Sequence, residues 1–223
     1  MTQAAAEAQL RKAIIAAACR MNDLGINQGK SGNLSARIPR GFLVTPTGMP
    51  YDALKPADIV AMDFKGAHRG KRLPSSEWRF HRDILAARPE VNAIVHTHAV
   101  FATTLACLRR EIPPFHYMVA VAGGDSIRCA PYATFGTEEL SKNAVAALAG
   151  RKACLLANHG MIAVGSTLDQ ALALAVEVET LAAMYWRALQ IGVPPLLDRA
   201  EMARVIEKFR TYGQQRRPRS RAS

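Results

Sequence analysis

Apolar positions along the chain follow two periods, one typical of helices and one typical of strands. Leu10, Ile14 and Met21 recur at multiples of three to four residues, which predicts a helix over 3–22 that ends before Gly25. The same spacing predicts further helices over 77–87, 99–107, 137–148, 168–189 and 199–210. Short apolar runs bounded by Gly, Pro and Asn predict strands over 41–44, 59–62, 92–98 and 153–157. Because no Pro- or Ser-rich linker separates these segments, we expect a single α/β domain of three layers, without internal repeats.

Two of the predicted helices begin with residues that favour helix starts. Ser75 or Ser76 is expected to be the N-cap of the helix that begins at Glu77. Thr137, with Glu139 nearby, is expected to open the helix over 137–148 with a capping box. Both starts therefore predict side-chain hydrogen bonds to the first free backbone N–H groups.

The composition is that of a globular protein, and its positive charge is concentrated at one end. The chain has 223 residues, of which 49% are hydrophobic and 21% charged, and its formal net charge is +11. Six of the 29 Lys and Arg residues lie in 208–223, where no acidic residue occurs. We expect one domain over 1–213 and a basic, solvated tail over 214–223. No predicted helix in the body has a dense basic stripe with aromatic residues, so nucleic acid is not an expected partner.

The lengths of the apolar runs and the spacing of the cysteines indicate where in the cell the protein is expected. No stretch approaches the roughly 18 consecutive apolar residues of a membrane span, so no membrane partner is expected. The N-terminal apolar run is flanked by charges and lacks a signal-peptide pattern. The four cysteines are scattered and form no C-x-x-C pair, which favours reduced thiols in a cytoplasmic protein.

Three histidines lie at the ends of predicted strands. Residues i and i+2 of a strand point to the same face, so the imidazoles of His96 and His98 are expected to converge. By itself this pair predicts half of a metal site and a pair of hydrogen-bonded histidines equally well. His159, in the turn after the strand over 153–157, supplies a third imidazole and favours the metal site.

Two further segments have the features of an anion site. Ser75, Ser76 and Glu77 open a helix, where backbone N–H groups and hydroxyls bind phosphate and where a carboxylate can ligate a metal or act as a base. The Gly- and Asn-rich turn around Gly29 resembles a P-loop, but it is one residue short and follows a helix instead of a strand. We therefore reject nucleoside triphosphate binding and expect the turn to hold a single phosphate, with a contribution from Thr47 and Gly48.

The whole set of motifs resembles the class II aldolase/adducin family, and within it the aldolases that act on L-fuculose 1-phosphate. The matching segments are NQGKSGNLS (27–35), TPTGMPY (45–51), LPSSEWRFH (73–81), VHTHAV (95–100), HYMVAVAGGDSI (116–127), CAPYATFGT (129–137), NHGMIAV (158–164) and EKFRTYG (207–213). Eight motifs in the same order make the resemblance specific. It implies an α/β/α sandwich whose central, mainly antiparallel sheet is flanked by helices, and a homotetramer with active sites between subunits.

The resemblance also implies roles for individual residues. It assigns His96, His98, His159 and Glu77 as ligands of Zn²⁺, which Mn²⁺ or Co²⁺ could replace, and Glu77 as the base after it leaves the metal. Tyr117 matches a catalytic tyrosine delivered by a neighbouring subunit. The phosphate cradle is expected to consist of Gly32, Asn33, Thr47, Gly48, Ser75 and Ser76, and the site is expected to be closed by Phe135 and Tyr212. Lys30 departs from the family because it replaces a small hydroxyl residue in the phosphate turn.

These roles imply reversible cleavage of a ketose 1-phosphate into dihydroxyacetone phosphate and a small aldehyde. L-fuculose 1-phosphate, 5-deoxyribulose 1-phosphate and 5-methylthioribulose 1-phosphate, the last from nucleoside salvage, fit equally well at this stage. An L-ribulose-5-phosphate 4-epimerase and a methylthioribulose-1-phosphate dehydratase are alternatives with related chemistry. An adducin-like interaction module is an alternative from another class, but such modules lack the metal histidines that this chain retains.

Overall fold

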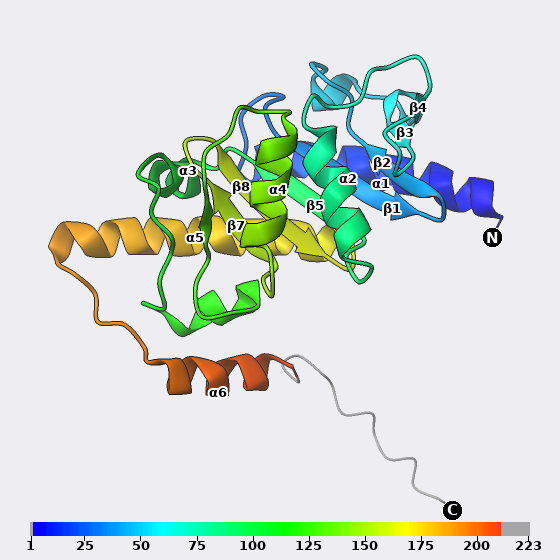
Figure 1. The fold of residues 1–223 in the computed structure, drawn as a ribbon. Helices are drawn as coiled ribbons and strands as arrows, with labels where there is room; N and C mark the ends of the chain where they lie inside the picture. The colour runs from blue at the N-terminus through cyan, green and yellow to red at the C-terminus, as the bar shows by residue number, and fades with distance from the viewer. Residues whose placement is uncertain (1, 211–223) are drawn as a thin grey trace, which may run out of the picture.

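A computed structural model describes residues 2–210 of the chain, which form helices on both faces of a single sheet (Figure 1). The helices are α1 (Gln3–Asp23), α2 (Trp78–Ala87), α3 (Val100–Cys107), α4 (Glu138–Ala147), α5 (Leu168–Ile191) and α6 (Arg199–Phe209), with short 3₁₀ turns η1 (Tyr51–Ala53), η2 (Pro56–Asp58) and η3 (Tyr117–Ala122). The strands are β1 (Asn33–Ile38), β2 (Gly41–Val44), β3 (Val60–Met62), β4 (His68–Arg69), β5 (Ala93–Thr97), β6 (Cys129–Ala130), β7 (Ala153–Leu156) and β8 (Gly160–Gly165).

The sheet separates two hydrophobic cores. Its strand order is β4-β3-β2-β1-β5-β8-β7-β6, and every pair is antiparallel except β6 with β7. Alternate residues of β5 enter opposite cores, Val95 with α1, α3 and α5 and Ile94 with α2 and α4. Figure 1 shows α2 and α4 on one face and α5 with α1 on the other. The expected α/β/α sandwich with a mainly antiparallel sheet is confirmed.

Four strands were not expected from the sequence. In β1, Leu34 and Ala36 face the core of α1 and α5, while Ser35 between them points toward α2. This alternation covers only a few residues and directly follows the glycine-rich turn. The polar residues and glycines of the turn therefore obscure the strand pattern in the sequence. The strand β8 is an apolar run between two glycines, and β4 and β6 have only two residues each. Strand pairing across the sheet, more than local pattern, defines these four elements.

One expected N-cap and one expected capping box differ from the structure, whereas the Thr137 cap is confirmed. Glu77 itself is the N-cap of α2, and its side chain caps no backbone group because the carboxylate faces the histidines. Ser75 instead accepts a hydrogen bond from the backbone N–H of Glu77. Thr137 does cap α4, accepting from the N–H of Leu140 at 3.2 Å. The capping box is wrong because Leu140 occupies the position that would need a carboxylate or an amide.

The helix α3 is capped by a residue far away in the chain. Its N-cap, Ala99, has no side chain that could accept a hydrogen bond. The carboxylate of Glu179 on α5 accepts from the backbone N–H groups of Phe101 and Ala102, both at 2.8 Å. Because α3 begins two residues after His98, this contact fixes the segment after β5 to α5.

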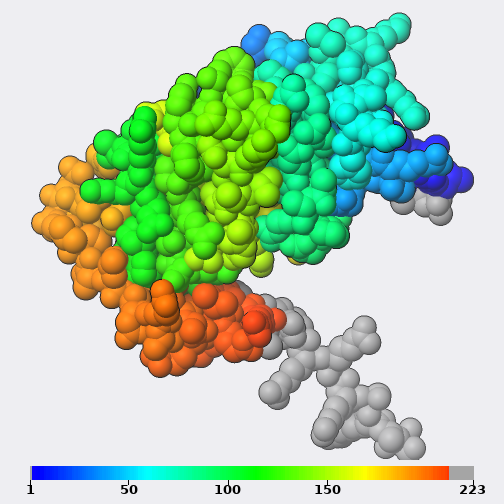
Figure 2. All heavy atoms as spheres, in the orientation of Figure 1, coloured from blue at the N-terminus to red at the C-terminus, as the bar shows by residue number. Residues whose placement is uncertain are grey.

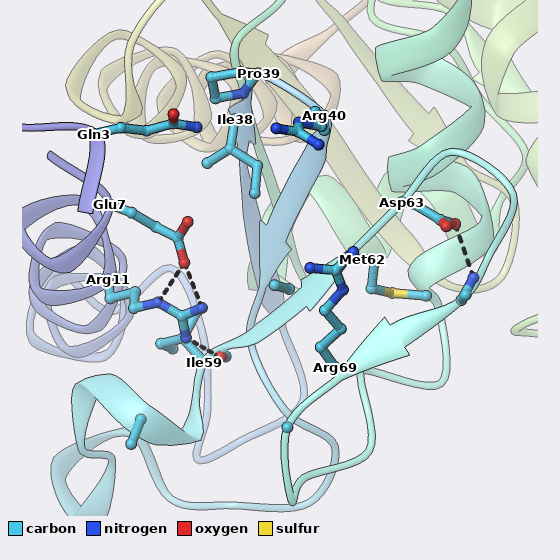
Figure 3. Close-up of a pocket in the computed structure, with 14 residues that line it drawn as sticks. Gln3, Glu7, Arg11, Ile38, Pro39, Arg40, Ile59, Met62, Asp63 and Arg69 are labelled. Atoms are coloured by element: carbon cyan, nitrogen blue, oxygen red, sulfur yellow. Dashed lines mark hydrogen bonds and ion pairs between the residues drawn. The ribbon is translucent and has the colours of Figure 1, made fainter.

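A hollow lies between the N-terminal half of α1 and the outer strands β3 and β4 (Figure 3). Within it, Arg11 forms an ion pair with Glu7 at 2.7 Å and donates to the carbonyl oxygens of Pro56 and Ile59. Arg11 therefore joins α1 to the turn before β3. Among the described residues, no helix is long and apolar enough to cross a membrane.

Candidate metal centre

Four side chains from three parts of the fold bring one ligand atom each to a common point. His96 and His98 lie at the end of β5, His159 lies in the β7–β8 turn, and Glu77 stands at the start of α2. Their ligand atoms all lie within 4.8 Å of one another. The Nε2 atom of His96 is 3.1 Å from Nε2 of His98 and 3.2 Å from Oε2 of Glu77, and Oε1 of Glu77 is 3.1 Å from Nε2 of His159.

Sheet pairing places the histidines. His96 pairs with Ile162 of β8 on one side and with Asn33 of β1 on the other. Gly160 begins β8 directly after His159, and a Cβ there would lie 2.5 Å from the carbonyl oxygen of Thr97 and 2.8 Å from Cδ2 of His98. Only glycine lets the turn approach β5 this closely. The sequence interpretation did not assign Gly160 to the site, although its position after His159 was a usable signal.

The histidine rings present lone pairs to the centre. Nδ1 of His96 lies 2.9 Å from the carbonyl oxygen of Met161, which can only accept, so Nδ1 carries the proton. In the neutral ring, Nε2 then faces the cluster with its lone pair. Burial, followed by repulsion from His96 and His159, lowers the pKa of His98 to about 4. His98 is therefore a neutral ligand at physiological pH.

Glu77 is an ionised carboxylate in a buried position. Burial acts to raise the pKa of Glu77, but the electrostatic attraction of the facing His96 and His159 imidazoles outweighs it and holds the pKa well below its usual range. Oε1 of Glu77 is a buried oxygen without a hydrogen-bond partner among the described residues. Oε2 accepts a hydrogen bond from Nδ2 of Asn33 at 2.9 Å.

This donor set fits a divalent metal ion. Nε2 of His96 and Oε2 of Glu77, which lie 3.2 Å apart, are both atoms that can donate a lone pair to a cation. Three imidazoles and one carboxylate are the ligand types that Zn²⁺ takes, and all four atoms are compactly arranged. A cation would also satisfy the buried Oε1 of Glu77.

The expected phosphate-binding segments lie next to one another. The backbone N–H of Thr47 donates to the carbonyl oxygen of Leu73, and that of Ser75 donates to Thr45, so the segments 45–48 and 73–76 are joined. The Nζ atom of Lys30 donates to the carbonyl oxygen of Gly48 at 3.0 Å and brings the glycine-rich turn to the same place. Ser75 is buried beside Glu77.

Two other members of the expected cradle, Gly32 and Asn33, pack against the metal residues. A Cβ on Gly32 would lie 2.6 Å from the carbonyl oxygen of His96, and the carbonyl oxygen of Gly32 accepts from the hydroxyl of Tyr51. The side-chain amide of Asn33 donates one of its two N–H groups to Glu77, and its Oδ1 lies 2.6 Å from Nε2 of His81. His81 and Ser35, which hold Asn33, were missed by the sequence interpretation.

The residues expected to complete the site are not gathered at the cluster within one chain. Tyr117 is half-exposed and lines a groove between η3 and α6. Figure 2 shows α6, in orange to red, packed at one end of the molecule. No cluster residue lines this groove. Phe135 is exposed on the loop before α4, beside Gly136, whose carbonyl oxygen accepts from Nε of Arg79 on α2. Tyr212 and the tail over 214–223 lie outside the described residues.

Comparison with known proteins gives one consistent result. The family model described as the class II aldolase and adducin N-terminal domain matches residues 12–186. The chain is 61% identical to a 5-methylthioribulose-1-phosphate/5-deoxyribulose-1-phosphate aldolase of Rhodospirillum rubrum, over 92% of each chain. It is 52% identical to an L-fuculose phosphate aldolase of Escherichia coli, over 92% of this chain and 96% of the relative. A solved L-fuculose 1-phosphate aldolase superposes with a TM-score of 0.88 at 40% identity, covering 91% of this chain and 96% of the other.

Proposed function

This chain belongs to the class II aldolase and adducin family and is an aldolase, and we propose that it cleaves 5-deoxypentulose 1-phosphates, among them 5-methylthioribulose 1-phosphate. The products would be dihydroxyacetone phosphate and a small aldehyde. The 61% identity to the R. rubrum aldolase, against 52% to the E. coli L-fuculose phosphate aldolase, supports this choice of substrate. L-fuculose 1-phosphate is the second candidate substrate.

The cluster of Glu77, His96, His98 and His159 is the observation that carries the proposal. A divalent ion bound by these residues, which we propose to be Zn²⁺ with Mn²⁺ or Co²⁺ as substitutes, supplies positive charge that stabilises the negative charge developing on the substrate ketone as the C3–C4 bond breaks. An adducin-like interaction module has no need of such a cluster. Related epimerases use similar chemistry, so the products distinguish them.

Glu77 is proposed to move the proton at C3. In cleavage, the C4 hydroxyl loses its proton to a base, the electrons of the C3–C4 bond move into the C2–C3 bond, and those of the C2 carbonyl move onto its oxygen. Glu77 takes up one proton and passes it to C3 as the carbonyl re-forms, so the proton gained at C3 balances the one lost at the C4 hydroxyl. In synthesis the Glu77 carboxylate removes that proton from dihydroxyacetone phosphate. Asn33 holds Oε2 at 2.9 Å and His159 faces Oε1 at 3.1 Å, so the carboxylate would exchange these two contacts for the substrate when it turns toward C3.

The joined segments 45–48 and 73–76, with the turn at 29–33, are proposed to bind the phosphate. Backbone N–H groups and the hydroxyls of Thr47, Ser75 and Ser76 are donors suited to a dianion. Lys30 adds a positive charge whose Nζ already lies within 3.0 Å of Gly48. Phosphate binding at this point would fix C1 of the substrate and so position C3 relative to Glu77.

The assembly is proposed to be a homotetramer in which Tyr117 of one subunit serves the metal site of the next. The position of Tyr117 in the η3–α6 groove, away from its own cluster, supports this assignment. Tyr117 there would take the proton of the C4 hydroxyl as a phenolate in cleavage and return it as a phenol in synthesis. A cytoplasmic location is supported by the four cysteines, all of which are free thiols.

A coupled assay for dihydroxyacetone phosphate tests the function. We expect release from 5-deoxyribulose 1-phosphate and 5-methylthioribulose 1-phosphate with a higher kcat/KM than from L-fuculose 1-phosphate. Conversion of L-ribulose 5-phosphate into xylulose 5-phosphate, without release of dihydroxyacetone phosphate from any 1-phosphate, would identify an epimerase instead. His96→Ala is the control for metal-independent background.

A further inference from the structure

His81 lies in the middle of a buried chain of hydrogen bonds that ends on Glu77. Its Nδ1 atom is 2.7 Å from Oγ of Ser35, and its Nε2 atom is 2.6 Å from Oδ1 of Asn33. Nδ2 of Asn33 is in turn 2.9 Å from Oε2 of Glu77. All four side chains are buried, and His81 and Ser35 have no exposed surface at all.

The carboxylate of Glu77, at the end of this series of hydrogen bonds, determines which atom donates in each of them. The ionised carboxylate of Glu77 can only accept, so the amide nitrogen of Asn33 faces it and Oδ1 faces His81. Nε2 of His81 must then carry the proton, and Nδ1 must accept from the hydroxyl of Ser35. In the neutral imidazole each of these three hydrogen bonds therefore has one direction.

The surroundings of His81 favour the same neutral state. The helix α2 packs its ring against Phe80, with the centroids 4.6 Å apart, and β1 supplies Ser35 and Asn33. The charged groups that act on it are His96 and Glu77, with opposite signs. Burial, followed by repulsion from His96, lowers the pKa of His81 to about 3.

We propose that neutral His81, protonated on Nε2, is a positioning residue that fixes the amide of Asn33 so that an N–H group, and not a carbonyl oxygen, meets Glu77. If the amide were reversed, Oδ1 of Asn33 would face Oε2 of Glu77, two acceptors 2.9 Å apart. His81 thus holds Oε2 in place in the resting enzyme while Oε1 has no hydrogen-bond partner among the described residues. The inference rests on the proposed function only in taking Glu77 as both metal ligand and proton carrier.

Two substitutions of similar polarity separate positioning from packing. Glutamine carries an N–H group close to the place of imidazole Nε2, whereas asparagine reaches only the place of Nδ1. We expect His81→Gln to keep zinc affinity and kcat within about threefold of the parent. His81→Asn should weaken zinc binding and lower kcat by about 10- to 100-fold, the usual effect of losing an outer hydrogen bond to a metal ligand. KM should change much less than kcat in both variants.

The matched control is Ser141→Ala, which removes a partly buried hydrogen bond from α4 to Asp83 on the same helix, α2. It should lower thermal stability without changing zinc affinity. Zinc affinity is measured by chelator competition, and the tautomer of His81 by ¹⁵N NMR of histidine-labelled protein, so neither readout needs turnover. Equal zinc affinity in His81→Asn and His81→Gln, or a proton on Nδ1 of His81, would overturn the proposal. Both readouts stand even if no tested sugar phosphate proves to be a substrate.

Discussion

The contact between Gly160 and the histidine strand gives a quantitative prediction. In Gly160→Ala, the new methyl group would lie 2.5 Å from the carbonyl oxygen of Thr97 and 2.8 Å from Cδ2 of His98. Ordinary contact begins at 3.4 Å, so β8 and β5 must separate by about 0.9 Å at the Thr97 carbonyl oxygen, and the distance to the His98 ring must grow by about 0.6 Å. Metal ligands tolerate deviations of only about 0.2 Å, so we expect the affinity for zinc to fall.

We expect Gly160→Ala to bind zinc about 10- to 100-fold more weakly than the parent protein. The overpacking should also lower the free energy of unfolding by about 1–3 kcal/mol. Chelator competition measures the affinity, and thermal unfolding with and without zinc measures the stability. The matched control is Gly192→Ala, because nothing lies within 4 Å of the Cβ position at Gly192 and its φ of 170° suits any residue. The reasoning is refuted if Gly160→Ala binds zinc as tightly as this control does.

Three further predictions address substrate binding, assembly and folding. Ser75→Ala should raise KM about tenfold through a lost hydrogen bond to phosphate, whereas Glu77→Gln should lower kcat far more than it raises KM. Steady-state kinetics with the opposite result would contradict phosphate binding by Ser75 and proton transfer by Glu77. A mixture of the Tyr117→Phe and His96→Ala variants should recover part of the activity in mixed rings. If mass spectrometry shows subunit exchange but no activity returns, Tyr117 acts within its own subunit or has no catalytic role. Glu179→Ala should lower the free energy of unfolding by about 1–2 kcal/mol through loss of the α3 cap. An unchanged free energy of unfolding in a denaturant titration would show that the cap does not stabilise the fold.

Local pattern was enough for those elements and ligands whose signal is contained in a few neighbouring residues. The six helices were predicted to within a few residues because each has an apolar face of helical period. His96 and His98 were predicted to converge because a strand places alternate residues on one face, and they do. His159 was expected in the same site because it follows a predicted strand, whereas the assignment of Glu77 as a ligand of that site needed the resemblance to the family.

The features that the sequence did not disclose depend on contacts between distant segments. Asn33 pairs with His96 across β1 and β5, so its amide lies beside Glu77, a relation that no spacing in the chain reveals. His81 was hidden because a histidine on the buried face of a helix is compatible with plain core packing. Glu179 caps a helix that begins nearly 80 residues earlier in the chain.

The most direct test of the account is metal-dependent release of dihydroxyacetone phosphate from 5-deoxyribulose 1-phosphate by the purified chain. Activity and bound metal are measured on the same sample before chelation, after removal of metal, and after zinc is restored. The account predicts about one divalent ion per chain, loss of activity with the ion and its return with zinc, and neither metal nor activity in His96→Ala, His98→Ala or His159→Ala. Full release of dihydroxyacetone phosphate by the metal-free protein, or full metal occupancy in any of these three variants, would contradict it.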